Sequence, residues 1–358
     1  MTYTRKENEA EARARLNAFW SGSSLGRPAL HVVARDQTAQ LPAWPGDPKV
    51  SLRNDYDPSW HVWHAECELR STIYLAEAMP GITLRWGTLL TTVAMLAGAE
   101  YAYESGSAWI KEIPNLWDMP LPVFDPQGKA ALALEDTLRA VAEAVGQRGY
   151  VSPPAMLDGL TTLSSFRTPE RLCFELIERP EDVMLWNEAL TDIYIAGYQH
   201  LHQFVTGLGY GETSTWLRLM APGSFEAVQC DFAVMLSPAM FERFVLPPLV
   251  RTVESLDYAL YHLDGTCQLR FLPMLRQIEE LHGIQWNPEP AAGSPTEWIT
   301  ELREIKESGL LLHITCETVD EARVLARDLG PNGLYLILPE FESEEEAVEA
   351  IDAIRGRC

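Results

Sequence analysis

The amino-acid sequence predicts an α/β protein of the (β/α)8, or TIM-type, barrel class, with a helical and irregular N-terminal extension. In the second half of the chain, short apolar segments alternate with amphipathic stretches four times in succession, the pattern of parallel βαβ units. The length of 358 residues with 47% hydrophobic content is enough for one large core. We find no internal repeat and no linker that divides the chain.

The N-terminal third is the irregular part of the chain. Its expected elements are a helix at 7–19, the apolar run ALHVV at 29–33, a proline-rich loop through Pro58, a helix at 60–78, and a segment at 81–122 interpreted as a cap over the site. We therefore assign about 1–125 to the extension and cap elements and about 126–358 to regular βα units, within a single domain of 1–358.

The regular part begins with a helix rich in alanine and carboxylates. The predicted helices are 129–147, one from Thr168–Pro169, 180–205, 237–256, 296–308, 319–329 and 343–355. The apolar segments between them are 150–157, 214–220, 228–232, 258–264, 283–287, 310–316 and 333–339. We expect the last four of these segments to be adjacent parallel strands.

The charge balance bears on possible partners. There are 28 Lys and Arg against 51 Asp and Glu, a formal net charge of -23, which repels phosphate backbones and anionic lipid headgroups. Nucleic acid and membrane surfaces are therefore excluded as expected partners, and a small-molecule substrate is favoured. The oligomeric state stays open, with a homodimer as one alternative.

The cysteines and the N-terminus indicate a cytoplasmic protein. The six cysteines form no CxxC pair, which fits free thiols in a reducing compartment. The N-terminal stretch is charged and has no apolar core of a signal peptide, and no run is long enough to span a membrane.

Polar residues stand at the ends of the predicted strands. Because the carboxyl ends of parallel strands open on one mouth, these residues are candidates for chemistry. They are Asp158, Cys230, Asp231, His262, Asp264, Asn287, Glu289, Cys316 and Glu340. We expect Asp231, Asp264 and Glu289 to be catalytic, and Asp158 and Asn287 to contact substrate.

His262 and Asp264 are spaced by two, so on an extended strand they point to the same side. Histidine is the commonest metal ligand, and carboxylates and thiolates complete zinc sites. We therefore take His262, Asp264, Cys316, Glu340 and Cys230 as candidate ligands. A metal-free acid/base pair and a purely structural pair remain open, and Cys316 alone is as well explained by core packing.

Aromatic and cationic residues suggest the walls of a substrate pocket. Trp216 and Trp286 lie near predicted strand ends, although tryptophan is also a good core residue. Four arginines stand beside apolar runs and are candidates for an anionic group: Arg85, Arg167, Arg218 and Arg270. The alternative for each is a helix cap or a carboxylate pair. Arg218 is our choice for a substrate contact.

Several motifs resemble the uroporphyrinogen decarboxylase superfamily over most of the chain. The stretch at 154–183, the helix LSPAMFERFVLPPLVRTVESL at 236–256 and the strand end YHLDG are similar to that family. The resemblance implies the barrel fold. In corrinoid-linked methyltransferases of this superfamily a His-x-Cys pair and a later Cys bind zinc. His262 matches the His, whereas Asp264 stands where the first Cys is expected. Pro339–Glu340 stands where the later Cys is expected, and Cys316, one strand earlier, could take its place in space.

Three functions remain open. The first is methyl transfer at a metal site, with zinc and a corrinoid protein partner as methyl donor. The second is a metal-free decarboxylase or lyase that uses Asp231, Asp264 or Asp158 as acid or base and needs no cofactor. The arginine-rich substrate motif of uroporphyrinogen decarboxylase is not reproduced at 26–37, so porphyrinogen itself is not the favoured substrate. The third is a non-catalytic binding protein on a degenerate barrel.

Overall fold

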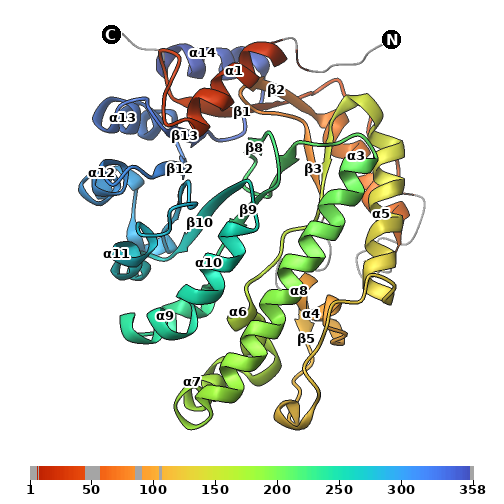
Figure 1. The fold of residues 1–358 in the computed structure, drawn as a ribbon. Helices are drawn as coiled ribbons and strands as arrows, with labels where there is room; N and C mark the ends of the chain where they lie inside the picture. The colour runs from red at the N-terminus through yellow and green to blue at the C-terminus, as the bar shows by residue number, and fades with distance from the viewer. Residues whose placement is uncertain (1–5, 7, 45–56, 85–90, 105–106, 355–358) are drawn as a thin grey trace.

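The structure is a computed structural model that describes residues 6, 8–44, 57–84, 91–104 and 107–354. Its centre is a seven-stranded sheet in the order β2-β1-β13-β12-β11-β10-β9, in which β2 is antiparallel to β1 and all other pairs are parallel (Figure 1). The strands of this sheet are β1 (Ala29–Arg35), β2 (Thr72–Ala76), β9 (Phe225–Val228), β10 (Tyr258–Asp264), β11 (Gly283–Asn287), β12 (Leu311–Thr315) and β13 (Leu334–Ile337).

The prediction of four adjacent parallel strands in the second half is confirmed by β10 to β13. The chain is thus an α/β protein with a mostly parallel sheet. The sheet ends at β2 and β9, so no closed barrel is present among the described residues. Smaller strand pairs lie beside it: β3 (Gly81–Thr83) with β6 (Tyr150–Ser152), β4 (Tyr101–Glu104) with β5 (Ser107–Ile110), and β7 (Thr213–Ser214) with β8 (Met220–Ala221).

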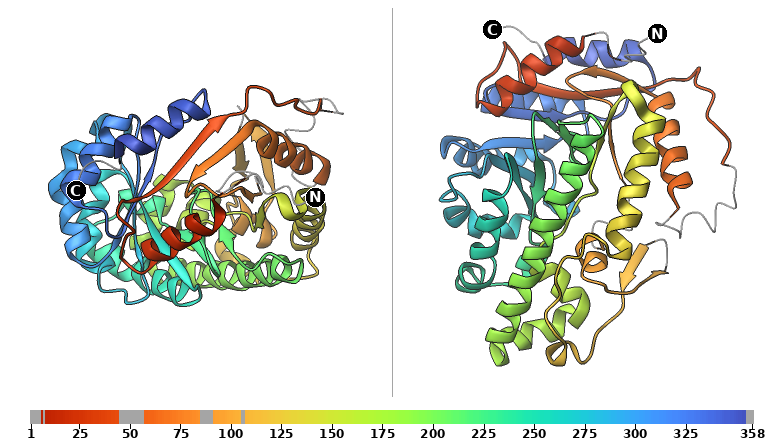
Figure 2. Two further views of the ribbon diagram at one scale, coloured as in Figure 1. Left: turned by 90° about the horizontal axis from the view of Figure 1, so that it is seen from above. Right: turned by 45° about the vertical axis from the view of Figure 1, so that its right-hand side comes forward.

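Helices cover the outside of the sheet, with α11, α12 and α13 side by side along one flank of the molecule (Figure 2). The first part of the chain forms α1 (Glu9–Trp20), α3 (Pro58–Ser71), α4 (Thr92–Leu96), α5 (Lys129–Val145), α6 (Gly159–Arg167), α7 (Pro169–Glu178) and α8 (Pro180–Gly207). The later helices are α9 (Pro238–Phe244), α10 (Leu246–Glu254), α11 (Leu272–Leu275), α12 (Ile299–Glu307), α13 (Val319–Leu329) and α14 (Glu344–Ile354).

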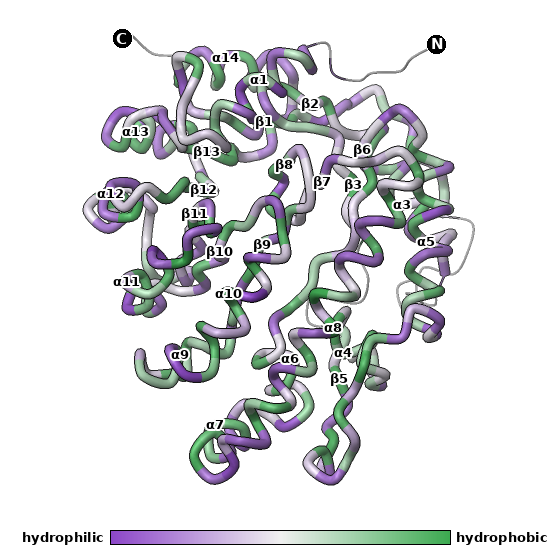
Figure 3. Tube along the Cα trace, in the orientation of Figure 1, coloured by the Kyte–Doolittle hydropathy of each residue, from purple (hydrophilic) through white to green (hydrophobic). Residues whose placement is uncertain are grey.

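Alternation along the strands builds two cores. Outward-facing side chains such as Ile284 and Leu312 join the helices in the large core, whereas Leu260, Leu311 and Tyr335 face the other way and pack with α1 and the β7–β8 hairpin. Figure 3 shows that hydrophobic and hydrophilic residues also alternate along the helices. None of the helices in the described part of the chain has the length and apolar character needed to cross a bilayer.

The inner face of the sheet carries a row of polar side chains. Four of these side chains are paired in register across neighbouring strands: His262 of β10, Gln285 of β11, His313 of β12 and Tyr335 of β13. His313 Nε2 lies 2.9 Å from the carbonyl of Leu217, and Tyr335 donates its hydroxyl to the carbonyl of Arg218 at 2.8 Å. This row therefore anchors the loop between β7 and β8 against the sheet.

Several predicted elements differ from the observed ones; the segments 150–157 and 228–232, for example, are strands only at 150–152 and at 225–228. The helix expected at 60–78 ends at Ser71 and continues as β2, where β-branched and aromatic residues favour a strand along β1. The segment 214–220 is mostly the loop of the β7–β8 hairpin. The helix expected at 237–256 is broken at Val245, because the prolines that follow in LPPLV have no N–H to donate; the side-chain amide of Asn187 donates to the carbonyl of Phe244 instead, at 2.8 Å.

A buried ion pair holds the start of β1 to the end of β2. Glu77 is 1% exposed and accepts from the Arg27 guanidinium at 2.8 Å and from the backbone N–H of Leu30 at 2.7 Å. A buried charge that loses its partner is strongly destabilising, because the remaining charge is desolvated without compensation.

We predict that Glu77→Ala lowers the free energy of unfolding by about 3 to 5 kcal/mol. Urea unfolding followed by circular dichroism measures the change. Exposed Glu349 on α14 provides the control, since Glu349→Ala should shift the value by less than about 0.5 kcal/mol. Equal effects of the two substitutions would contradict the proposed importance of the pair.

Strand β9 buries a second carboxyl side chain, that of Glu226. Burial raises the pKa of Glu226 to about 8 against the opposing hydrogen bond from the Ala227 N–H, so the side chain is protonated in the folded protein at neutral pH. In the unfolded chain a glutamate ionises near its ordinary pKa of about 4.3. The folded state thus binds one more proton between these values, and stability falls as pH rises through that window.

Replacing Glu226 with Gln should remove this loss. Relative to Glu226→Gln, the wild type should lose up to about 1.4 kcal/mol of stability per pH unit between about pH 5 and pH 8, with no further divergence above. Urea unfolding at four pH values across the window tests this expectation. Parallel stability curves for the two proteins would show that Glu226 is ionised in the fold.

Candidate functional site

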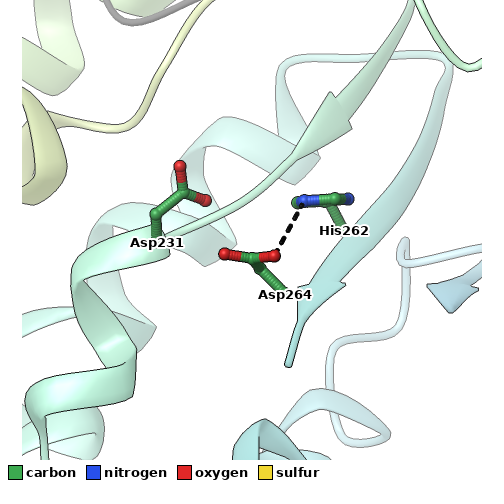
Figure 4. Close-up of side chains that lie close together, drawn as sticks. All are labelled: Asp231, His262 and Asp264. Carbon is green, nitrogen blue, oxygen red and sulfur yellow. Dashed lines mark ion pairs between the residues drawn. The ribbon is translucent and has the colours of Figure 1, made fainter. Parts of the chain in front are cut away.

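Three side chains from two neighbouring strand ends converge at the carboxyl edge of the sheet (Figure 4). His262 and Asp264 are the fifth and last residues of β10, and Asp231 is the first residue of the short helix η3 (Asp231–Met235) after β9. One potential ligand atom from each lies within 4.8 Å of the other two. We call this group the Asp-His-Asp cluster.

Gln285 fixes the orientation of the His262 ring. Its side-chain N–H donates to the carbonyl of Trp286 at 3.2 Å, which leaves its oxygen to accept from His262 Nδ1. The lone pair of the neutral ring is then on Nε2, which lies 3.8 Å from the Asp264 carboxylate. Burial lowers the pKa of His262, against the raising effects of Gln285 and Asp264, and the neutral form is the one that binds metals.

Asp264 is held at the rim of the site. Its carboxylate accepts from the side-chain amide of Asn287 at 2.9 Å, and the carbonyl of Asn287 accepts from the backbone N–H of Gly265 at 2.8 Å. Gly265 has φ +87°, a left-handed conformation that a side chain disfavours. The Asp–Gly turn therefore lets β10 end sharply while Asp264 stays partly open to solvent.

Asp231 has a less polar environment than Asp264. Its Oδ1 is buried and has no hydrogen-bond partner among the described residues. Burial raises the pKa of Asp231 to about 7, and the Asp158 and Asp264 carboxylates raise it further in the same direction. The cluster thus combines a neutral imidazole, one partly solvated carboxylate and one carboxyl group that holds a proton near neutral pH.

A cavity of about 640 Å³ lies beside the cluster. Trp216 lies between the cavity and the cluster: it lines the cavity, and its ring packs edge-on against the His262 ring with centroids 5.0 Å apart. Arg218 and His31 also line the cavity. This volume is in the range of pockets for small organic ligands.

The cysteines that the sequence offered as metal ligands lie outside the Asp-His-Asp cluster. Cys230 is fully buried and its sulfur accepts from the Thr161 hydroxyl at 3.8 Å. Cys316 is also buried, and burial raises the pKa of its thiol to about 12. Glu340 lines the cavity at its exposed rim, 3.5 Å from the Arg35 guanidinium, and is not part of the cluster either.

Other predicted site residues have structural partners. Asp158 caps α6 by accepting from the N–H groups of Leu160 and Thr161 at 3.0 Å, and Glu289 accepts from the backbone and hydroxyl of Thr266 at 2.8 Å. Trp286 faces the helices, packs against Trp298 and belongs to the large core. Of the substrate contacts proposed from sequence, Trp216 and Arg218 line the cavity, and Asn287 orients Asp264.

Sequence reasoning missed Gln285 and His31. Both are polar residues within otherwise apolar strands, and both are buried on the inner face. A polar residue within a mostly apolar strand was the signal in the sequence. Only the register of β10 with β11, however, shows that Gln285 faces His262.

Comparison with protein-family models gives no match for this chain, and comparison with curated proteins gives none either.

The hydrogen bond from His262 predicts a specific tautomer. At pH 7 the ¹⁵N chemical shifts of His262 should show a protonated Nδ1 and an unprotonated Nε2, with Gln285→Leu removing this preference because the acceptor is lost. Long-range ¹H–¹⁵N spectra measure the tautomer, and His262→Ala assigns the resonances. A protonated Nε2 in the wild type would contradict the geometry.

Proposed function

We propose that this protein is an enzyme that binds a divalent cation through Asp231, His262 and Asp264 and acts on a small molecule in the adjacent cavity. The observation that carries the proposal is the convergence of one imidazole nitrogen and two carboxylates within 4.8 Å. Two carboxylates so close together repel one another, and a cation compensates that repulsion.

The surroundings of the cluster fit a metal centre. Gln285 and Asn287 each hold one candidate ligand by a hydrogen bond, as residues around metal ligands do in known sites. The three side chains leave room for further ligands, so a bound cation would supply a Lewis acid for an oxygen atom of the substrate. Asp264 is 41% exposed at its side chain, which gives a path from solvent.

The donor set differs from a thiol-activating zinc site. The cluster contains no thiolate, and Cys230 and Cys316 are buried elsewhere. Nitrogen and oxygen ligands suit harder cations such as Mn²⁺ and Mg²⁺ as well as Zn²⁺. The cluster therefore favours activation of an oxygen-containing substrate over activation of a thiol.

For the reaction we propose methyl transfer, with a corrinoid protein as donor partner, on the basis of the resemblance to the uroporphyrinogen decarboxylase superfamily. The same resemblance supports a (β/α)8-type barrel in which the parallel pair β3–β6 contributes to the wall between β2 and β9. The position of the cluster at the carboxyl ends of parallel strands agrees with this fold, because barrel enzymes place their chemistry there.

A metal-free decarboxylase or lyase is the second candidate. Its support is Asp231, whose buried Oδ1 has no partner in the described part of the chain. A carboxyl group in such an environment keeps its proton near neutral pH and can donate it to a carbanion that forms when carbon dioxide leaves.

Metal titration separates these candidates. Isothermal titration calorimetry of chelator-treated protein with Mn²⁺ and Zn²⁺ should give one site per chain, and His262→Ala and Asp264→Ala should weaken it at least about tenfold. Methyl transfer is then measured with the metal-loaded protein and a small oxygen nucleophile as acceptor: methylcobalamin should give cob(I)alamin as the acceptor oxygen becomes methylated.

The two cysteines provide matched controls. Cys230→Ala and Cys316→Ala should leave the metal affinity unchanged, because both sulfurs lie outside the cluster. Absence of binding by the folded wild type would reject the metal proposal and leave the decarboxylase candidate. Loss of binding in either cysteine variant would show that a thiolate belongs to the site.

A further inference from the structure

In the described part of this acidic chain, most of the strongly buried arginines form ion pairs with carboxylates or hydrogen bonds with carbonyls. Arg167 is 3.0 Å from Glu175, and Arg27 pairs with Glu77. Arg270, a candidate for anion binding from sequence, donates to the carbonyls of Val234 and Leu236. Arg85, another such candidate, lies outside the described residues.

Arg218 differs from Arg27 and Arg167 because it is exposed at the cavity. It lines the cavity, and within the described ranges its guanidinium has no hydrogen bond or carboxylate partner. The carboxylates that also line the cavity lie near other groups: Glu340 is 3.5 Å from Arg35, and Glu68 is 3.9 Å from His64, which lines the cavity too. The cationic group therefore faces the cavity without an anion of its own.

The backbone at Arg218 is held in an unfavourable conformation. Its φ of +56° is left-handed, which costs about 1 to 2 kcal/mol for a residue with a side chain. The loop is nevertheless well anchored, since Arg218 donates its N–H to the carbonyl of Thr215 at 2.9 Å and its carbonyl accepts from Tyr335. Strain of this kind persists where the surrounding structure imposes it, often at ligand sites.

Two neighbours of Arg218 supply further polar atoms. Trp216 lines the same cavity, and its indole Nε1 is buried without a hydrogen-bond partner among the described residues. His31 lines it too, is 4% exposed, and its Nδ1 likewise lacks a partner in the part of the chain described. Burial, with the Arg218 charge adding to it, lowers the pKa of His31 to about 3, so this ring stays neutral.

We propose that the cavity binds a small carboxylate-bearing molecule, with its carboxylate on the Arg218 guanidinium and its other end toward Trp216 and the Asp-His-Asp cluster. This assignment deepens the proposed function by naming the substrate class. A guanidinium pairs with a carboxylate through two parallel hydrogen bonds, and Trp216 provides an apolar wall for the body of the molecule. One arginine in the described lining suits a single anionic group better than a polyanion.

Ligand-observed NMR and calorimetry with simple probes test this assignment. The probes are benzoate and phenylacetate, each compared with its neutral amide, in low salt and with chelator present. Wild type should bind at least one of the carboxylates at least about tenfold more tightly than its amide. Arg218→Gly should abolish this preference, and Arg218→Lys should restore part of it.

The variants are chosen to separate binding from folding. Glycine tolerates the left-handed conformation at 218, so Arg218→Gly should keep the melting temperature of the wild type. Exposed Arg276 provides a control for lost charge, and Arg276→Gln should bind the probes like wild type. Failure of both carboxylates to bind wild type, or their equal affinity for wild type and Arg218→Gly, would overturn the proposal.

The metal measurements keep this result apart from the proposed function. Arg218→Gly should bind Mn²⁺ as wild type does, because Arg218 is not a ligand. Carboxylate binding that persists in His262→Ala, together with absent metal binding in all proteins, would support the Arg218 site and reject the metal centre.

Discussion

The parallel register of β10 to β13 is the constraint on which the site depends. It aligns His262, Gln285, His313 and Tyr335 in one row on the inner face of the sheet. One end of the row orients the His262 ring, and the other end holds the loop that carries Trp216 and Arg218. A slip of one residue in any of these pairings would turn the affected side chains toward the helices and dismantle both halves of the site at once.

Polar residues in this row are tolerated because nearly every one has a partner. His313 contacts a loop carbonyl, stacks on Tyr335 with ring centroids 5.2 Å apart, and has its pKa lowered to about 4 by burial, so it packs as a neutral ring. On the amino-terminal side of the row, Leu260 and Leu311 form an apolar layer with α1. The inner face thus changes from apolar at the amino ends of the strands to polar at the carboxyl ends, which places the candidate site at one edge of the sheet.

The sequence predicted the strands of the second half of the chain, whereas the closed barrel that it also predicted is not seen among the described residues. The segments of β10 and β11 and the helix α13 have the expected bounds, because turn residues and capping signals flank strong apolar patterns. Asp231, His262 and Asp264 were also predicted as candidate site residues at the ends of their strands. The sequence could not exclude Cys230 and Cys316 as metal ligands, because that depends on the direction in which the short segment after each strand turns. Gln285 was missed because its role exists only through the pairing of β11 with β10.

Charge compensation links the cluster to its surroundings. Burial and two neighbouring carboxylates, Asp158 and Asp264, raise the pKa of Asp231 to about 7, so a nearby counter-charge favours its ionised form. A proton on Asp231 removes its negative charge, and a divalent cation held by Asp231, Asp264 and His262 Nε2 would compensate both carboxylates in its place. Arg218 presents the opposite case, a positive charge that lines the cavity without an anion. A ligand carboxylate would compensate Arg218, as a cation would compensate the cluster. Trp216 lines the cavity and packs against His262, which is why we treat the two features as parts of one site.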